Sequence, residues 1–153
     1  MDVETTTLGR EVIACAIDVH STLGPGLLEP LYQRCMSIEM ASRGLRFREQ
    51  LALPVTYKGH DVGFGYRIDF LVEEELVIEL KSVERILPVH HAQVLTYLRL
   101  LKVRQAFLMN FNHRRLVDDS RLSWCPARHC PGSARCRTAC AAACERSAAA
   151  EGQ

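Results

Sequence analysis

Three charged residues lie in the apolar stretch YRIDFLVEEELVIELKSV, where a buried β-strand normally carries aliphatic side chains. Asp69 is followed ten residues later by Glu79, and Lys81 comes two residues after Glu79. Two carboxylates in a place of low dielectric constant repel each other, and a divalent cation relieves that repulsion. Oxygen ligands of this kind suit Mg²⁺ or Mn²⁺, which also takes water and phosphate oxygens. A neighbouring lysine can orient or deprotonate an attacking water, or stabilise charge on a phosphate.

The same residues also allow a plainer interpretation. Lys81 would then neutralise one carboxylate in a structural ion-pair cluster at the edge of a sheet. The three consecutive acids at 73–75 belong to neither interpretation, because they are typical of a solvated turn.

The pattern around the charges predicts a β-hairpin. Residues 66–72 and 76–83 have the composition of strands, and the acids at 73–75 make a three-residue loop between them. In that register Asp69 lies opposite Glu79, and Lys81 shares the face of Glu79 because side chains alternate along a strand. We therefore expect the three side chains to meet on the sheet.

The elements that must support this hairpin can be predicted from the spacing of apolar residues. Helices are expected over 8–23, 28–43 and 88–101, and strands over 47–57 and 104–112, with a short glycine-rich strand before residue 66. In the strand over 47–57, alternation places Phe47, Glu49, Leu51 and Leu53 on one face. The order is α-α-β-β-β-β-α-β, which predicts an α/β fold with a mixed sheet and helices on both faces.

The chain of 153 residues is 48% hydrophobic and 24% charged, so one domain with its own core is expected. We place that domain at residues 1–119. Residues 1–122 contain 15 Lys and Arg against 16 Asp and Glu. Such a balance excludes a general polyanion binder held by bulk charge, so any contact with nucleic acid must be local.

The chain has no run of 18 apolar residues, so no transmembrane helix is expected. The start, MDVETTTLGRE, lacks the basic residues and the apolar stretch of a signal peptide. The sequence therefore predicts a cytoplasmic protein that does not contact the membrane.

Residues 120–153 differ in composition, being rich in Cys, Ala and Arg, and they predict a disordered or loosely helical tail. Five cysteines gather there: Cys125, Cys130, Cys136, Cys140 and Cys144. No two of them form the Cys-x-x-Cys pair that marks a strong zinc site. Disulfides are not expected in a reducing cytosol.

Several separated motifs together resemble a known family. Asp69 and the ELK at 79–81 fit the D…(D/E)-x-K signature of the PD-(D/E)XK nuclease superfamily. GLLEPLY at 26–32 fits Gly-x-x-Glu-x-x-Tyr. With GYRIDFLVE, VIELKSVERILPVHHAQVLTYLRL and LMNFN, the chain resembles the small bacterial GxxExxY family of that superfamily over residues 8–117.

This resemblance implies a restriction-endonuclease-like core and metal-dependent hydrolysis of phosphodiester bonds in DNA or RNA. Asp69 and Glu79 match the ligands of Mg²⁺ or Mn²⁺, and Lys81 matches the catalytic lysine. Glu29 matches a helical acid that many members place near the metal. Gln93 and Tyr97 match a Q-x-x-x-Y element, whose spacing puts both side chains on one helical face for contact with the DNA backbone.

Each of these roles has a structural alternative. Glu29 begins a helix, where an acid is favourable to the helix dipole. Gln93 and Tyr97 can simply anchor their helix to the sheet. The whole domain can also be a non-catalytic binding or regulatory module, because a fold does not establish activity. A further alternative is an accessory subunit whose hold on DNA comes from a partner or a second copy.

Overall fold

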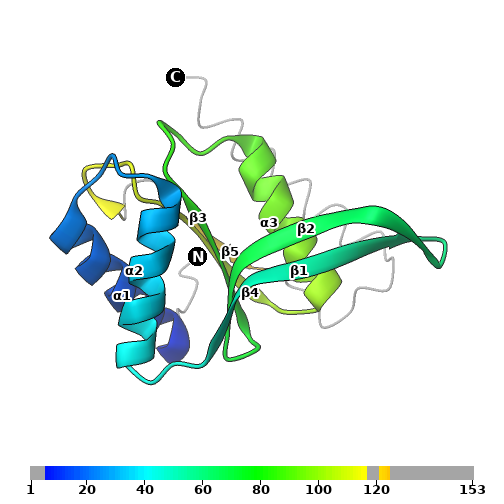
Figure 1. Ribbon diagram of the computed structural model, residues 1–153, viewed down its shortest axis with the longest axis horizontal. Coiled ribbons are helices and arrows are strands. Elements are labelled where there is room, and N and C mark those ends of the chain that lie inside the picture. Colours follow the sequence, from blue (N-terminus) through cyan, green and yellow to red (C-terminus); the bar gives the residue numbers. More distant parts are fainter. Residues whose placement is uncertain (1–5, 117–120, 125–153) are drawn as a thin grey trace.

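The computed structural model describes residues 6–116 and 121–124 and arranges them in three layers (Figure 1). α1 and α2 cover one face of a central sheet, and α3 covers the other. The elements are α1 (Thr7–Leu23), α2 (Glu29–Ser42), β1 (Phe47–Tyr57), β2 (His60–Val72), β3 (Leu76–Lys81), α3 (Pro88–Leu101), β4 (Gln105–Asn110) and β5 (Arg121–Trp124). The predicted α/β fold with a mixed sheet and helices on both faces is confirmed.

The sheet has the strand order β1-β2-β3-β4-β5. β3 and β4 are parallel and connected through α3, whereas the other neighbouring pairs are antiparallel. A parallel pair needs such a crossover, which carries the helix onto a face of the sheet. β3 is therefore hydrogen-bonded on both sides and is buried from Leu76 to Leu80.

Each face of the sheet has its own apolar core. Phe70, Ile78 and Leu80 pack with α1 and α2, where Val12, Tyr32 and other side chains are fully buried. Ile68, Val77 and Leu108 pack with the Val94–Leu98 side of α3. The sheet is buried on both faces at β3 and β4, which explains why these two strands are nearly continuous apolar sequence.

The order of elements differs from the prediction at two places. The predicted glycine-rich strand and the strand over 66–72 are one continuous strand, β2, of 13 residues. In addition, the sheet contains a strand, β5, that the sequence does not predict, with Phe107 of β4 opposite Leu122. The domain boundary at residue 119 stays a prediction. The predicted tail from residue 125 onward, with all five of its cysteines, lies outside the described residues.

The alternation of side chains in β1 is interrupted at Gln50. Phe47 packs against the α1–α2 core, but Leu51 and Leu53 pack against the α3 core, although a regular strand would place all three on one face. Gln50 has a φ of 52°, a left-handed conformation that is uncommon for a residue other than glycine. The prediction of a single face for these residues is therefore wrong, because the strand turns over at Gln50.

The distal half of the β1–β2 hairpin extends away from the body as a two-stranded projection (Figure 1). The hairpin ends in a tight turn at Lys58 and Gly59, both with positive φ, which is the geometry that matches the twist of paired strands. None of the helices in the described ranges is long and apolar enough to span a lipid bilayer.

Candidate active site

The candidate site lies where β2 and β3 separate. The antiparallel ladder includes Phe70 with Ile78 but ends there, one pair short of Asp69 and Glu79. The backbone N–H of Leu80 donates to Asp69 Oδ2 at 2.7 Å in place of a further ladder bond. The predicted hairpin register is thus confirmed up to Phe70. Beyond it, the Asp69 carboxylate occupies the gap between the two strands.

Glu79 and Lys81 lie on the same face of β3, as predicted. Lys81 Nζ donates to Glu79 Oε1 at 2.5 Å, and the two side chains are only 14% and 4% exposed. The other carboxylate oxygen, Glu79 Oε2, is buried and has no hydrogen-bond partner in the described part of the chain. A buried, unpaired carboxylate oxygen is unfavourable by itself, which indicates a position for a ligand.

Glu29 reaches the same charges from the first turn of α2. It is half-buried, and its pKa is affected by Lys81, by Asp69 and by the backbone N–H of Ser82. The Ser82 hydroxyl also donates to the Leu27 carbonyl at 2.6 Å, which connects the loop before α2 to the residue after β3. Favourable interaction with the helix dipole is therefore not the whole environment of Glu29, because it also faces the charged centre.

The loop before Glu29 is fixed by Tyr32, which is fully buried. The Tyr32 hydroxyl donates to the Gly24 carbonyl at 2.6 Å and accepts from the Leu27 N–H at 3.1 Å. Gly26, between them, has a φ of 89°, which favours glycine. Gly26 and Tyr32 of the Gly-x-x-Glu-x-x-Tyr pattern thus shape the loop that carries Glu29 to the site.

All three carboxyl groups have raised pKa values. Burial raises the pKa of Glu79 to about 7, and the nearby Asp69 charge adds to this rise. Burial also raises the pKa of Asp69 and of Glu29, although Lys81 opposes the rise at both. Burial tends to lower the pKa of Lys81, but the hydrogen bond to Glu79 and the surrounding carboxylates outweigh it, so the pKa is raised. One ammonium group therefore faces three carboxyl groups.

Gln50 is a site residue that the sequence did not reveal. Its side-chain Nε2 donates to Asp69 Oδ1 at 3.2 Å and to Gln33 Oε1 at 2.8 Å. Gln33 comes from α2, so this chain of hydrogen bonds connects the helix to the carboxylate. The only available signal was that Gln50 and Asp69 lie between the Glu49–Phe70 and Leu51–Ile68 pairs of β1 and β2, which requires knowledge of pairing between distant residues.

Gln93 and Tyr97 lie on α3 and contact each other, the Gln93 amide donating to the Tyr97 hydroxyl. Tyr97 is fully buried, and its hydroxyl donates to the Arg67 carbonyl of β2 at 3.5 Å. In this position Tyr97 anchors α3 to β2. Gln93 is half-buried and is therefore the member of the pair that can reach a substrate.

The residues fit a hard divalent cation held by two carboxylates. Among the residues that the structure describes, no group of three or more His, Cys, Asp and Glu is arranged to hold a metal ion. Asp69 and Glu79 would thus act as a pair, and Glu79 Oε2 has an unused lone pair. Mg²⁺ commonly binds through one or two carboxylates together with water and substrate phosphates. The surplus of carboxyl groups over ammonium groups favours the same ligand.

The comparison with protein-family models agrees with the fold and the site. The model of the PD-(D/E)XK nuclease superfamily matches residues 6–122. This match covers most of the chain and includes every element from α1 into β5. The chain belongs to the PD-(D/E)XK nuclease superfamily. Searches of curated proteins and of solved structures found no match.

Proposed function

We propose that this protein is a metal-dependent nuclease that hydrolyses phosphodiester bonds in DNA, with RNA as the other possible substrate. The observation that carries the proposal is the buried Asp69–Glu79–Lys81 centre, in which Glu79 Oε2 has no partner within the described residues. A structural ion-pair cluster would not need a surplus of carboxylates, nor an unpaired oxygen. The Tyr32-fixed loop around Glu29 also supports membership of the GxxExxY family.

Asp69 and Glu79 would hold Mg²⁺ or Mn²⁺. Such a cation, when bound, polarises a phosphate oxygen and lowers the pKa of water. Lys81 keeps its proton because its pKa is raised, so its role is to orient the attacking water and to stabilise negative charge on the phosphate. Glu29 adds a third carboxyl group on the α2 side of the site. Gln93 contacts the substrate backbone, and Tyr97 holds the Gln93 side chain in place.

The test is a nuclease assay with Mg²⁺ or Mn²⁺ on single-stranded, duplex and branched DNA and on RNA. Wild type should cleave at least one of these. Asp69→Asn and Glu79→Gln should lose activity by about 10²- to 10⁴-fold, because bound metal contributes several kcal/mol to transition-state stabilisation. Glu75→Gln, the same change at an exposed acid of the β2–β3 loop, is the matched control and should keep full activity.

Calorimetric titration with Mn²⁺ tests the ligands without a substrate. Asp69→Asn and Glu79→Gln should weaken Mn²⁺ binding, whereas Glu75→Gln should not. Cleavage that persists in Asp69→Asn would show that the assigned centre is wrong. Nucleic-acid binding without any cleavage would instead favour a non-catalytic module. We also propose that a second copy of the chain cooperates in cutting both strands, and sedimentation of the same samples tests for such a dimer.

A further inference from the structure

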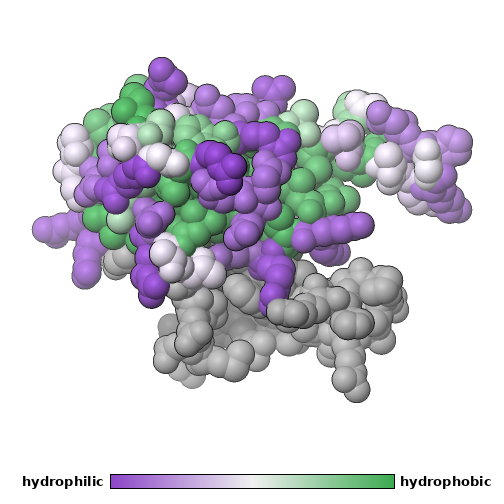
Figure 2. Space-filling model, turned by 90° about the horizontal axis from the view of Figure 1, so that it is seen from below, coloured by the Kyte–Doolittle hydropathy of each residue, from purple (hydrophilic) through white to green (hydrophobic). Residues whose placement is uncertain are grey.

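The projection at the end of the β1–β2 hairpin, here called the arm, comprises residues 54–65. None of its residues is buried, and none belongs to either apolar core. In the space-filling view the arm stands clear of the body and carries a mixture of polar and apolar residues (Figure 2). Its most exposed large apolar side chain is Phe64, at 83%. Stability of the fold gives no reason for an exposed aromatic ring at this position.

Phe64 lies in a β-bulge of β2. Three residues of β2, Val62 to Phe64, lie opposite a single residue of β1, because Pro54 pairs with Gly65 and Thr56 pairs with Asp61. Gly63 has a φ of 71° there, and its N–H donates to Asp61 Oδ1 at 2.8 Å. Such bulges redirect side chains, and this one turns Phe64 outward.

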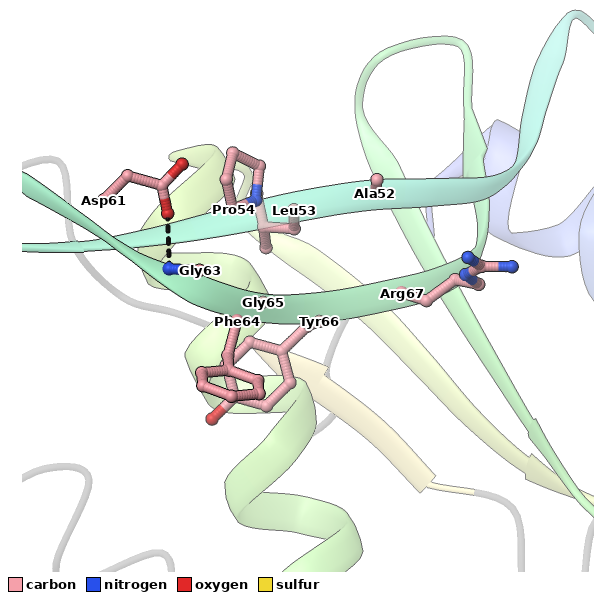
Figure 3. Close-up of a pocket in the computed structure, with 9 residues that line it drawn as sticks. All are labelled: Ala52, Leu53, Pro54, Asp61, Gly63, Phe64, Gly65, Tyr66 and Arg67. Carbon is pink, nitrogen blue, oxygen red and sulfur yellow. Dashed lines mark hydrogen bonds between the residues drawn. The ribbon is translucent and has the colours of Figure 1, made fainter.

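The exposed ring lies on the same strand as Asp69 of the candidate active site. Phe64 and Tyr66 are two residues apart and point to the same side of β2 along a shallow groove (Figure 3). The Tyr66 ring packs edge-on against the Tyr97 ring of α3, with centroids 5.5 Å apart. Tyr97 is fully buried, and its hydroxyl donates to the Arg67 carbonyl at 3.5 Å, two residues before Asp69 on β2. The exposed aromatic side chains of β2 therefore end at Tyr66, and the strand continues from there to Asp69.

The charges near this surface favour a polyanion. Between residues 54 and 67 the cations are Lys58 and Arg67, and the only acid is Asp61, which already binds the Gly63 N–H. Within the described part of the chain Arg67 has no carboxylate partner, and it is exposed two residues before Asp69. Within the arm itself Lys58 and Asp61 balance each other, so the excess positive charge near this surface is that of Arg67.

We propose that Phe64 and Tyr66 form a stacking platform for unpaired bases, and that Arg67 contacts the phosphates that lead from this platform to Asp69. The inference rests on the proposed function and names its substrate class: single-stranded segments or unpaired ends. Aromatic side chains stack on a base only where its face is free, and in a duplex the faces are covered by neighbouring base pairs. Every base has such a face, so the platform selects unpaired strand and not sequence.

The test measures binding without cleavage, so that it stands apart from the nuclease assay. Fluorescence anisotropy with the full chain in EDTA compares a short labelled oligothymidylate, the corresponding oligouridylate and a blunt DNA duplex. Wild type should bind the single strands more tightly than the duplex. Phe64→Ala should weaken single-strand binding by about 5- to 150-fold, the range expected for loss of one stacked base, and should leave duplex binding unchanged.

Two further variants act as controls for Phe64→Ala. Phe64→Trp should keep or strengthen single-strand binding, because it retains an aromatic face. Ile38→Ala, which removes an apolar side chain that is 57% exposed on α2, should leave binding unchanged. Equal single-strand affinity of Phe64→Ala and wild type would overturn the proposal. So would a change from dimer to monomer on sedimentation of Phe64→Ala with unchanged nucleic-acid binding, since the arm would then join two copies.

The proposed function and the platform can fail separately. Single-strand binding that depends on Phe64, in a protein that cleaves nothing with Mg²⁺ or Mn²⁺, would support the platform and refute the nuclease. Cleavage that depends on Asp69, with no effect of Phe64→Ala on binding or on the preference for single strands, would support the nuclease and refute the platform.

Discussion

The two halves of the β1–β2 hairpin serve opposite requirements. Near the body, Asp69 is 9% exposed and bonded on both oxygens, to Leu80 and to Gln50. At the far end, Phe64 is 83% exposed and lies in the bulge beside Gly63. A charged centre must be organised in advance, because its interactions are strong only where water is excluded. A surface that grips an extended partner must be open. One continuous strand, β2, provides both.

The largest difference between the two halves should appear when one lysine in each half is replaced by an uncharged residue. Lys81→Met leaves Glu79 buried beside Asp69 without its partner, and breaking a buried pair costs about 3 kcal/mol. Lys58→Met makes the same change on the arm, where the side chain is exposed, and should cost much less. Urea denaturation of the metal-free variants measures both. Equal stabilities would mean that the Glu79–Lys81 pair is not held in a low-dielectric place.

Gln50 allows a separation of stability from activity. Gln50→Ala loses the bond to Asp69 and keeps an unfavourable left-handed residue, whereas Gln50→Gly loses the bond but relieves the backbone. The glycine variant should be more stable than the alanine variant by about 1 kcal/mol. Both should lose activity by about tenfold, the effect typical of removing a residue that orients a metal ligand.

Lys102→Gly is the matched control for Gln50, because Lys102 ends α3 with a φ of 57° and lies outside the site. Lys102→Gly should be stabilised by a similar relief of left-handed backbone strain, and its cleavage rate should not change. Denaturation and initial cleavage rates measure the two properties. If Gln50→Gly keeps full activity, the Gln50 amide does not position Asp69.

Removal of the arm should leave the body almost unchanged. Replacing residues 54–65 by Asn-Gly would close the ladder at the Leu53–Tyr66 pair with a favourable two-residue turn. Because no buried side chain is lost, the free energy of unfolding should change by less than about 1 kcal/mol. Mn²⁺ affinity, measured by calorimetry, should be that of wild type. Loss of Mn²⁺ binding would contradict the independence of the two halves.

The smallest effect is expected at the β2–β3 loop. Hydrogen bonds from Arg46 lower the pKa of Glu73 below its ordinary value of 4.5. A lowered carboxyl pKa contributes stability above the unfolded value and loses it as the pH falls through the folded value. Wild type should therefore exceed Glu73→Gln slightly in thermal stability at pH 7, and the difference should disappear on acidification below pH 4.5. A difference that persists there would not come from ionisation.

The sequence predicted most of the fold because its local signals agree with the tertiary structure. The three-residue loop at 73–75 set the register of β2 and β3, and that register brought Asp69 near Glu79. Helical spacing of apolar residues likewise predicted the helices on both faces of the sheet, and period-two spacing predicted β1. What the register could not indicate is that the ladder ends at Phe70, since strand separation depends on how the rest of the sheet twists.

The glycines of β2 misled the prediction for a physical reason. The sequence predicts a short glycine-rich strand that ends before residue 66, but β2 continues through Gly63 and Gly65, with a bulge at Val62–Phe64. A Cβ at Gly65 would overlap the Leu53 carbonyl oxygen, so glycine is there to let the two strands approach. A glycine that breaks a strand and one that permits close pairing look alike in sequence. The turnover of β1 at Gln50 had no local signal either.

The central position of β3 has a consequence for synthesis of the protein. This strand carries Glu79 and Lys81, and one of its two neighbours, β4, begins 24 residues after Lys81 in the chain. Pairing between β3 and β4 must wait until α3 and β4 have left the ribosome, because contacts between distant residues form only after the intervening chain exists. A nascent chain that already contains every charged residue of the centre therefore still lacks the folded site, and under the proposed function its cleavage of nucleic acid has to wait for β4.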